Sequence, residues 1–322
     1  MSKQTPLAGK GRYAYLLSDA TFKVVVCTPE NEKLLIEIIE LLIPGKHISG
    51  ITFLNKEMHG LVLEEKNVTF DLLCKEEGTG EEFLVEVQNR DQNSFRDRVL
   101  VYSTYPIREQ MAVKMSDRSA AASRALASGE PLKPLGRMDY SLKPVYVISM
   151  VNFPFAHESA EALEEDYISR YELRNRHNAE LLTPSLNFVF LEMDRLPWGP
   201  EDKDKCGNLL EKFIFSMKYM HTLTERPEGF DDPLLKDLYE ATELGSMTIV
   251  QRQNYDNIMF TEIDRIATMD FAIKQAAEKG REEGMEKGRE EVALNLLRMN
   301  VPLETISKST GLSEEAILSL SK

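Results

Sequence analysis

The sequence of 322 residues has few of the residues and motifs that usually identify a reaction. It holds three cysteines and no Cys-x-x-Cys pair, so neither a disulfide framework nor a thiolate zinc site is expected. Its five histidines show no His-x-x-x-His or His-Glu-x-x-His spacing, and it contains no Walker loop, GxGxxG run or nucleophile elbow. These absences argue against zinc hydrolases, P-loop enzymes, dinucleotide-dependent enzymes and serine hydrolases.

Long apolar runs are also missing. No run reaches the roughly 18 residues that a membrane-spanning helix needs, and the first residues lack the apolar stretch of a secretory signal. We therefore expect a cytoplasmic protein without a membrane partner. Hydrophobic residues make up 42% of the chain, which is enough for one large domain or for a core domain with an appendage.

The chain is acidic, with a net charge of −14, which by itself argues against a nucleic-acid partner. The charge is unevenly distributed, however. Residues 89–143 carry ten Lys or Arg against six Asp or Glu, whereas the rest of the chain carries 29 against 47. The candidates for phosphate contacts in this basic segment are Arg90, Arg96, Arg98 and Arg108. The alternative is a solvated helix face with ordinary ion pairs.

The most informative pattern is a hairpin. Residues 67–74 and 82–88 each resemble a β-strand, and residues 75–81 between them contain the glycines of a turn. A turn centred between Gly78 and Thr79 sets the register of the two strands. The apolar residues favour this register because it gathers five of them on one buried face. They are Phe70, Leu72, Phe83, Val85 and Val87.

In this register Asp71 lies opposite Glu86, and Gln88 lies on the same face as Glu86. Cross-strand Cβ atoms are about 4.5–5.5 Å apart, so two facing carboxylates repel each other unless a positive group lies between them. A divalent metal ion would be such a group. A slip of one residue would send the Asp71 carboxylate to the other face. Leu73 and Leu84 would share the polar face, so the alternation is imperfect.

The Asp71…Glu86-x-Gln88 hairpin resembles the core of the PD-(D/E)xK nucleases. The wider order of motifs is similar to the Rpn-type family of recombination-promoting nucleases and transposases, from about residue 13 to 220 and again in the tail. These motifs are Asp19-Ala-Thr-Phe-Lys23, an amphipathic helix from about Glu32 to Leu42, the residues Phe95, Arg98, Tyr102, Tyr105 and Gln110, and Tyr140-Ser-Leu-Lys-Pro-Val-Tyr146 before a strand-like run to Phe155. The resemblance implies an α/β core with a mixed sheet flanked by helices.

The resemblance also implies a chemistry. Asp71 and Glu86 would hold Mg²⁺, which prefers oxygen ligands and activates a water for attack on a phosphodiester. Asp19 matches an acidic position of the family and would add a metal ligand or orient water; a helix N-cap is an equal alternative for it. Glu37 is a poorer candidate for this acid. Lys23, one helical turn after Asp19, would offset phosphate charge.

Gln88 departs from the general nuclease motif, which has lysine at this position. The resemblance gives Gln88 the role of orienting the attacking water or the scissile phosphate, but glutamine brings no positive charge. The Rpn-type branch resembles this sequence in having glutamine there. Phe70 also replaces the proline of the motif, a change without chemical consequence because that proline has no role in the reaction.

We therefore expect a Mg²⁺-dependent DNA endonuclease linked to recombination or mobile elements. An alternative from another class is a catalytically weak DNA-binding or oligomeric scaffold that retains the nuclease fold. An RNA nuclease is a third possibility. The intact acids Asp71 and Glu86 favour the enzyme, whereas Gln88 in place of lysine leaves room for weak activity.

The patterns along the chain suggest three regions. Residues 13–203 are expected to form the nuclease core. Within it, the polar residues 114–139 suggest a mobile insertion, and residues 157–178 an irregular segment with at least one helix. Residues 204–279 are expected to be a helical extension, and residues 280–322 a charged helix with a small helical tail.

The tail follows a short repeat, since Glu278-Lys-Gly-Arg-Glu-Glu283 recurs as Glu286-Lys-Gly-Arg-Glu-Glu291. After it we expect a helix over 302–310, a turn at Gly311 and a last helix N-capped by Ser313. This arrangement resembles a helix-turn-helix. Because it has few basic residues, packing or homo-oligomerisation through these helices is favoured over reading of DNA.

Overall fold

The structure, a computed structural model, describes residues 11–18, 20–54, 57–58, 68–69, 71–90, 94–127, 137–155, 157 and 167–320. It divides into two compact units, of which the larger ends at Met259 and the smaller begins at Phe260. In the larger unit the described residues form a sheet with helices, and in the smaller unit they are helical. None of the helices in the described ranges combines the length and apolar character that crossing a membrane requires.

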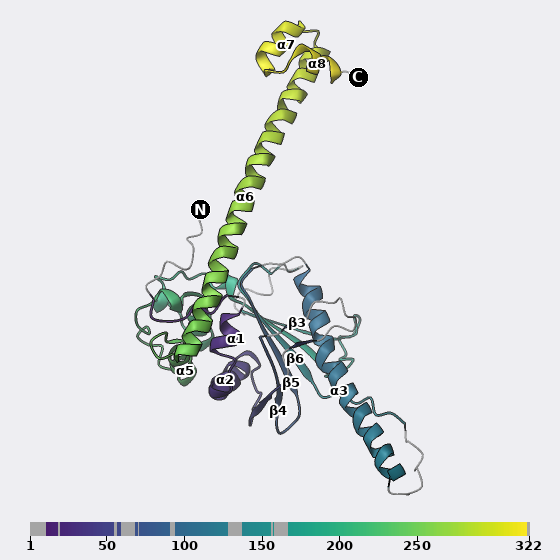
Figure 1. Ribbon diagram of the computed structural model, residues 1–322, viewed down its shortest axis with the longest axis vertical. Coiled ribbons are helices and arrows are strands. Elements are labelled where there is room, and N and C mark those ends of the chain that lie inside the picture. Colours follow the sequence, from purple (N-terminus) through teal and green to yellow (C-terminus); the bar gives the residue numbers. More distant parts are fainter. Residues whose placement is uncertain are drawn as a thin grey trace. The chain divides into compact units, whose positions relative to one another are not determined.

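A six-stranded mixed sheet forms the centre of the larger unit (Figure 1). In spatial order its strands are β1 (Ile51–Phe53), β4 (Leu72–Glu76), β5 (Glu82–Gln88), β6 (Val145–Val151), β8 (Leu186–Glu192) and β7 (Ile168–Glu172). The central strands β5, β6 and β8 run parallel, and the outer strands run antiparallel to their neighbours. The short strands β2 (Glu57–Met58) and β3 (Val68–Thr69) form a separate pair.

Helices and short helical turns complete the larger unit. The α-helices are α1 (Thr21–Val25), α2 (Glu32–Leu42), α3 (Phe95–Ala127), α4 (Leu209–Tyr219), α5 (Pro233–Thr242) and the first part of α6 (Ile249–Arg298). The 3-10 turns are η2 (Pro29–Asn31), η4 (Met193–Arg195), η5 (Lys203–Lys205) and η6 (Met220–Thr222). The amphipathic helix that the sequence predicted from about Glu32 to Leu42 is confirmed as α2.

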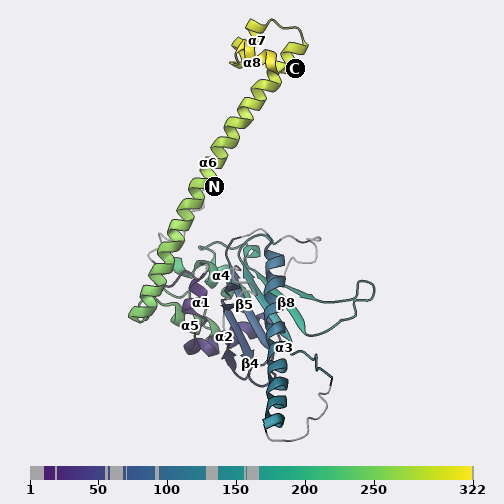
Figure 2. The ribbon, with the colours of Figure 1, turned by 45° about the vertical axis from the view of Figure 1, so that its right-hand side comes forward.

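The sheet is covered on both faces, as expected for parallel strands. Val85 and the residues two positions away on β5 face a core layer that α2, α4 and α5 complete. Leu84 faces the other layer with Leu73, and α3 packs Phe95 and Val99 there. Figures 1 and 2 show α2 and α3 on opposite sides of the sheet. Leu73 and Leu84 lie on the same face as Asp71 and Glu86, as the register predicted, but α3 buries this part of the face, so it is apolar there.

Helix α3 extends into the segment that the sequence predicted as a mobile insertion. The prediction of a mobile insertion over 114–139 is wrong for its first part, since α3 continues to Ala127; residues 128–136 lie outside the described residues. Side chains in this part of the helix, such as Val113 and Met115, are 57% exposed. An exposed helix needs no apolar stripe, which explains why its polar, Ala- and Ser-rich sequence resembled a loop.

The segment 157–178 also differs from its prediction. Where the structure describes it, the segment forms no helix but the edge strand β7, which pairs antiparallel with β8. Only the first residues of β7, Ile168 and Ser169, are buried. The remaining side chains are exposed, so the strand lacks the apolar alternation by which an edge strand can be predicted.

The smaller unit has the tail that the sequence predicted. Its last helices are α7 (Leu303–Thr310) and α8 (Glu314–Ser319). Gly311 ends α7 with φ +75°, the left-handed conformation that favours glycine, and Ser313 Oγ accepts a hydrogen bond of 3.2 Å from Ala316 N. Ala293, Ile306 and Ile317 are fully buried and form the core of this unit.

The helices that follow residue 203 share the core of the sheet. Phe213 and Phe215 of α4 and Leu235 of α5 belong to the same layer as Val85. The division into regions at residues 203 and 279 stays a prediction about the organisation of the chain.

Candidate active site

The hairpin of β4 and β5 has the register that the sequence predicted. Leu72 pairs with Val85, so Asp71, which directly precedes β4, comes opposite Glu86. The Asp71 side chain is almost fully buried, and its Oδ2 accepts a hydrogen bond of 2.7 Å from the backbone N–H of Val87. This bond fixes one oxygen of the Asp71 carboxylate beside the carboxyl end of β5.

Gln88 ends β5 two residues after Glu86 and on the same face. It is buried, and both ends of its amide are engaged. Nε2 donates to the carbonyl of Arg90 at 3.1 Å, and Oε1 accepts from Arg98 Nη2 at 2.5 Å. The orientation of the amide is therefore set by its partners, with the oxygen toward a cation.

Arg98 reaches this site from the first turn of α3. Its Nη2 lies 3.8 Å from Glu86 Oε1 as well as bonding to Gln88. The guanidinium carbon lies 5.1 Å from the centre of the Phe95 ring and 5.6 Å from that of Tyr102. Arg98 thus places a positive charge beside Gln88, the position at which the general motif has a lysine. From the sequence, Arg98 was predicted as a phosphate contact and as one of the residues that carry the family resemblance, but not as a partner of Glu86 and Gln88.

Tyr102 lies within the field of these groups. Burial raises the pKa of its phenol, the carboxylates of Glu86 and Asp71 raise it further, and Arg98 opposes them. The phenol therefore stays protonated at neutral pH, and the site has a neutral hydroxyl beside its charged groups.

A buried polar side chain on β6 lies beside Glu86. Ser149 is the register neighbour of Glu86, is fully buried, and its Oγ has no hydrogen-bond partner among the residues the structure describes. Just beyond the strand ends, Asn152 Nδ2 donates to Asn89 Oδ1 at 2.9 Å, and Asn89 Nδ2 donates to the Tyr15 hydroxyl at 2.7 Å. Sequence patterns gave no reason to select these residues, because none is charged.

A buried carboxylate on β8, that of Glu192, was not predicted as a site residue from the sequence. Glu192 is 1% exposed; its oxygens lie 2.9 and 3.0 Å from His157 Nε2, and Ser169 Oγ donates to one of them. The register places Gln88, Val151 and Glu192 in one row, so Glu192 lies about 10 Å from Gln88 along the sheet. A signal for it exists in the sequence, since an acid ends an apolar strand-like run.

The other predicted residues lie around this centre or outside the described residues. Arg96 is exposed, and its guanidinium lies 4.2 Å from the centre of the Phe155 ring. Arg90 is the second residue after β5, and its carbonyl accepts a hydrogen bond from Gln88 Nε2. Lys23 lies on α1 and is half-buried. Asp19 is not among the described residues.

The oxygen donors of the site fit a hard divalent cation. Asp71 and Glu86 offer carboxylates on one face of the sheet, and Mg²⁺ binds through one or two carboxylates while keeping several waters. No group of three or more His, Cys, Asp or Glu in the described ranges is arranged to hold a metal. Glu37, the poorer candidate for a further acid, lies on α2, where Lys33 is 3.4 Å away, and α2 covers the opposite face of the sheet.

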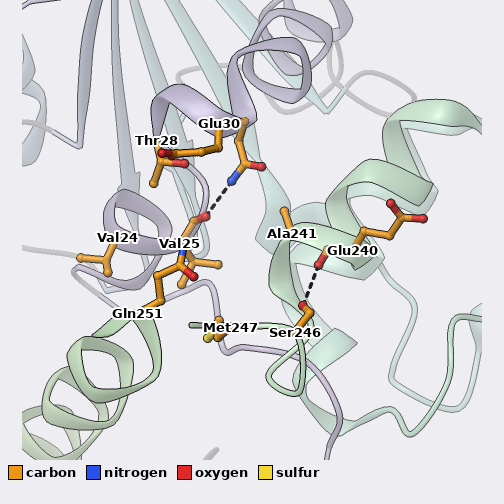
Figure 3. Close-up of a pocket in the computed structure, with 10 residues that line it drawn as sticks. Val24, Val25, Thr28, Glu30, Glu240, Ala241, Ser246, Met247 and Gln251 are labelled. Atoms are coloured by element: carbon orange, nitrogen blue, oxygen red, sulfur yellow. Dashed lines mark hydrogen bonds between the residues drawn. The ribbon is translucent and has the colours of Figure 1, made fainter. Parts of the chain in front are cut away.

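A small hollow elsewhere in this unit has a different character (Figure 3). It measures about 160 Å³ and lies beside α1, the end of α5 and the start of α6. Asn31 Nδ2 donates to the Val25 carbonyl at 3.0 Å, and Ser246 Oγ to that of Glu240 at 3.5 Å. Its described lining residues include no Lys, Arg or His, so the hollow does not suit a phosphate.

The mixed sheet flanked by helices, with carboxylates and an amide meeting at the end of β5, is an α/β fold of the nuclease type. Residues 16–272 match the family of the PD-(D/E)XK nuclease family transposases, and the chain belongs to this family. The predicted PD-(D/E)xK resemblance and fold class are thereby confirmed. No curated protein and no solved structure matches the chain.

Proposed function

We propose that the protein is a Mg²⁺-dependent DNA endonuclease that hydrolyses phosphodiester bonds. The observation that supports this most is the hairpin register, which brings Asp71 opposite Glu86 with Gln88 on the same face. Membership of a nuclease family supports the reaction class.

Each residue of the proposed site has a separate role in the reaction. Asp71 and Glu86 would hold the metal ion, which when bound polarises the phosphoryl group and lowers the pKa of the attacking water. Gln88, with its amide fixed by two hydrogen bonds, would orient the water or the scissile phosphate. Arg98 would offset the negative charge that develops on the phosphate. Asp19 would add a further acid to the site.

The surroundings supply the contacts that hold a nucleic-acid strand. Lys23, Arg90 and Arg96 would bind phosphates on either side of the scissile bond, in addition to Arg98. We further propose a cytoplasmic protein that acts in recombination or on mobile elements, and that self-associates through its C-terminal helices. Exposed apolar residues along α6, such as Phe260 and Phe271, support the last point.

A second candidate is a DNA-binding scaffold with little activity. It is favoured by Gln88, because Arg98 must provide from α3 the charge that a lysine would provide from β5 itself. An RNA substrate is the third candidate, since the described site contains no feature that reads the sugar.

Nicking of supercoiled plasmid by the purified chain tests the proposal. With Mg²⁺ the native protein should nick the plasmid, and chelation of the metal should abolish nicking. Asp71→Ala and Glu86→Ala should each lower the rate by about 10²–10³-fold, the scale of losing one group that stabilises transition-state charge. Glu77→Gln, an exposed acid in the same hairpin, is the matched control and should cleave normally.

The other outcomes separate the candidates. No nicking with Mg²⁺ or Mn²⁺, together with retained DNA binding, would contradict the nuclease and support the scaffold. If the protein cleaves RNA but not DNA in the same assay, its substrate is RNA and the proposed catalytic residues stay the same. Native-like nicking by both alanine variants would show that the reaction takes place elsewhere.

A further inference from the structure

A largely apolar cavity lies under the middle of α3, at the opposite end of β5 from the proposed nuclease site. It measures about 540 Å³, within the range of small-molecule sites, which is roughly 300–1,000 Å³. Leu73, Tyr105, Val113 and Leu142 form most of its apolar wall. Glu82, at this end, lies four residue steps along the strand from Glu86, which corresponds to about 13 Å.

A buried acceptor lies in this cavity. Glu82 is 5% exposed, and its Oε2 has no hydrogen-bond partner among the described residues. Burial raises the pKa of its carboxyl group to about 7; Lys75 and a hydrogen bond with Gln110 oppose this shift, and the nearby Glu109 carboxylate adds to it. A buried acceptor without a donor is costly, so a ligand that offers an N–H group here would gain from satisfying it.

Two lysines converge at the edge of the same cavity. Lys75 is the cross-strand neighbour of Glu82. Lys143 lies two residues before the start of β6. Their Cε atoms lie 3.4 and 3.6 Å from the position that a Cβ on Gly80 would occupy, so the two side chains run close together. Both are exposed, and neither forms an ion pair with a described residue. Two adjacent ammonium groups favour an anion between them.

We propose that this cavity binds a nucleotide, with its base against Tyr105 and Leu73, an N–H edge on Glu82 and its phosphate between Lys75 and Lys143. A nucleobase has apolar faces and a polar edge, which suits an apolar wall with one buried acceptor. An ionised carboxylate only accepts hydrogen bonds. Guanine suits it best, because it presents two adjacent N–H donors, whereas adenine presents a donor beside an acceptor.

The cavity lies at the other end of β5 from the proposed nuclease site. Nucleotide binding in it can therefore be tested independently of the nuclease activity. The nucleotide can come from two sources that share this chemistry: a free mononucleotide, or a guanosine unstacked from a single strand. The arms of the experiment distinguish them.

Calorimetric titration of the full chain with GMP, at pH 8 and without divalent metal, is the test. GMP should bind, AMP should bind at least about tenfold more weakly, and Glu82→Gln should weaken GMP by about tenfold or more, as expected for loss of a charge-assisted hydrogen bond. Lys143→Gln should weaken GMP while leaving guanosine, which lacks the phosphate, unchanged. Asp71→Ala should bind GMP normally, because it lies at the other end of β5.

The results that overturn the inference are equally plain. They are no binding of GMP by the native chain, or equal binding by the native chain and both the Glu82→Gln and Lys143→Gln variants. Lys143 is exposed, so its variant keeps the test valid if Glu82→Gln disturbs folding. Competition for GMP by a guanine-containing single-stranded oligonucleotide, but not by oligothymidine, identifies a strand as the source; its absence identifies the free nucleotide.

Discussion

The two ends of β5 carry carboxylates on the same face and under the same helix, yet their charges are balanced differently. At the carboxyl end, Arg98 lies 3.8 Å from Glu86 and also bonds to Gln88. At the amino end, Glu82 has no described ion-pair partner, and burial raises the pKa of its carboxyl group to about 7. Both acids are positioned by β5, but the residues of α3 near them differ: Arg98 lies near Glu86, and Glu109 lies near Glu82.

Helix α3 differs along its length in the charge it presents to the sheet. Its first turn provides Arg98, a cation, whereas three turns later it provides Glu109, whose like charge disfavours ionisation of Glu82. One end is therefore suited to hold charged acids near a metal and a phosphate. The other end holds an acid that titrates near neutral pH, inside a largely apolar cavity.

Among the variants that keep Asp71 and Glu86, removal of the cation at the carboxyl end of β5 should have the largest effect. Arg98→Ala should lower the rate of plasmid nicking by about 100-fold, because the charge on the phosphate is no longer offset and Gln88 loses its orienting donor. Arg98→Lys should retain part of the rate. The loss should appear in kcat more than in KM, which single-turnover cleavage of a labelled duplex can separate.

The matched control for this change is Arg252→Ala. Arg252 is an exposed arginine of α6 that is paired with Asp256 and is not among the residues of the proposed site. It should cleave at the native rate. If Arg98→Ala and Arg252→Ala behave alike, the difference between the two ends of β5 has no bearing on catalysis.

The buried acid Glu82 at the amino end of β5 should make the free energy of unfolding depend on pH. The folded chain keeps the Glu82 proton up to about pH 7, whereas the unfolded chain releases it near its ordinary pKa of 4.5. The contribution of Glu82 to the free energy of unfolding should therefore fall as pH rises from about 4.5 to 7. Glu82→Gln should remove this fall, gaining about 1–2 kcal/mol on the native chain between pH 5 and 8 once solvent screening is included.

Denaturant unfolding of both chains at several pH values measures this difference. Glu77→Gln, at an exposed acid of the same hairpin, should leave the pH dependence unchanged. Curves for the native chain and Glu82→Gln that stay parallel from pH 5 to 8 would show that the two acids of β5 do not differ in the folded chain.

A change in the smaller unit should affect neither end of β5. Ser313→Ala removes the N-cap of α8 and should destabilise the smaller unit by about 1 kcal/mol. Hydrogen exchange should increase in α7 and α8, while plasmid nicking and the pH dependence of the larger unit stay as in the native chain. A parallel loss of nicking would show that the two units are coupled.

The sequence was sufficient where a local pattern has one physical solution. The hairpin register followed from the turn at Gly78 and the apolar alternation, the α2 helix from its stripe of leucine and isoleucine, and the tail from Gly311 and Ser313. Each of these features is decided by residues that lie close together in the chain.

The features that the sequence did not reveal depend on distant residues. Arg98 stands ten positions after Gln88, and its bond to that amide exists only because α3 crosses the sheet face. The pairing of His157 with Glu192 likewise needs β8 to lie beside β6. The long exposed half of α3 resembled a loop, because no neighbour imposes an apolar stripe on it.

The most direct test of the account is to move the positive charge from α3 to β5. In the Arg98→Ala chain, Gln88→Lys restores the lysine of the general nuclease motif, next to Glu86. We predict that Mg²⁺-dependent nicking is lost in Arg98→Ala and regained in large part in the double variant. Native-rate nicking by Arg98→Ala alone would contradict the account, because the site would then need no cation beside Glu86 and Gln88.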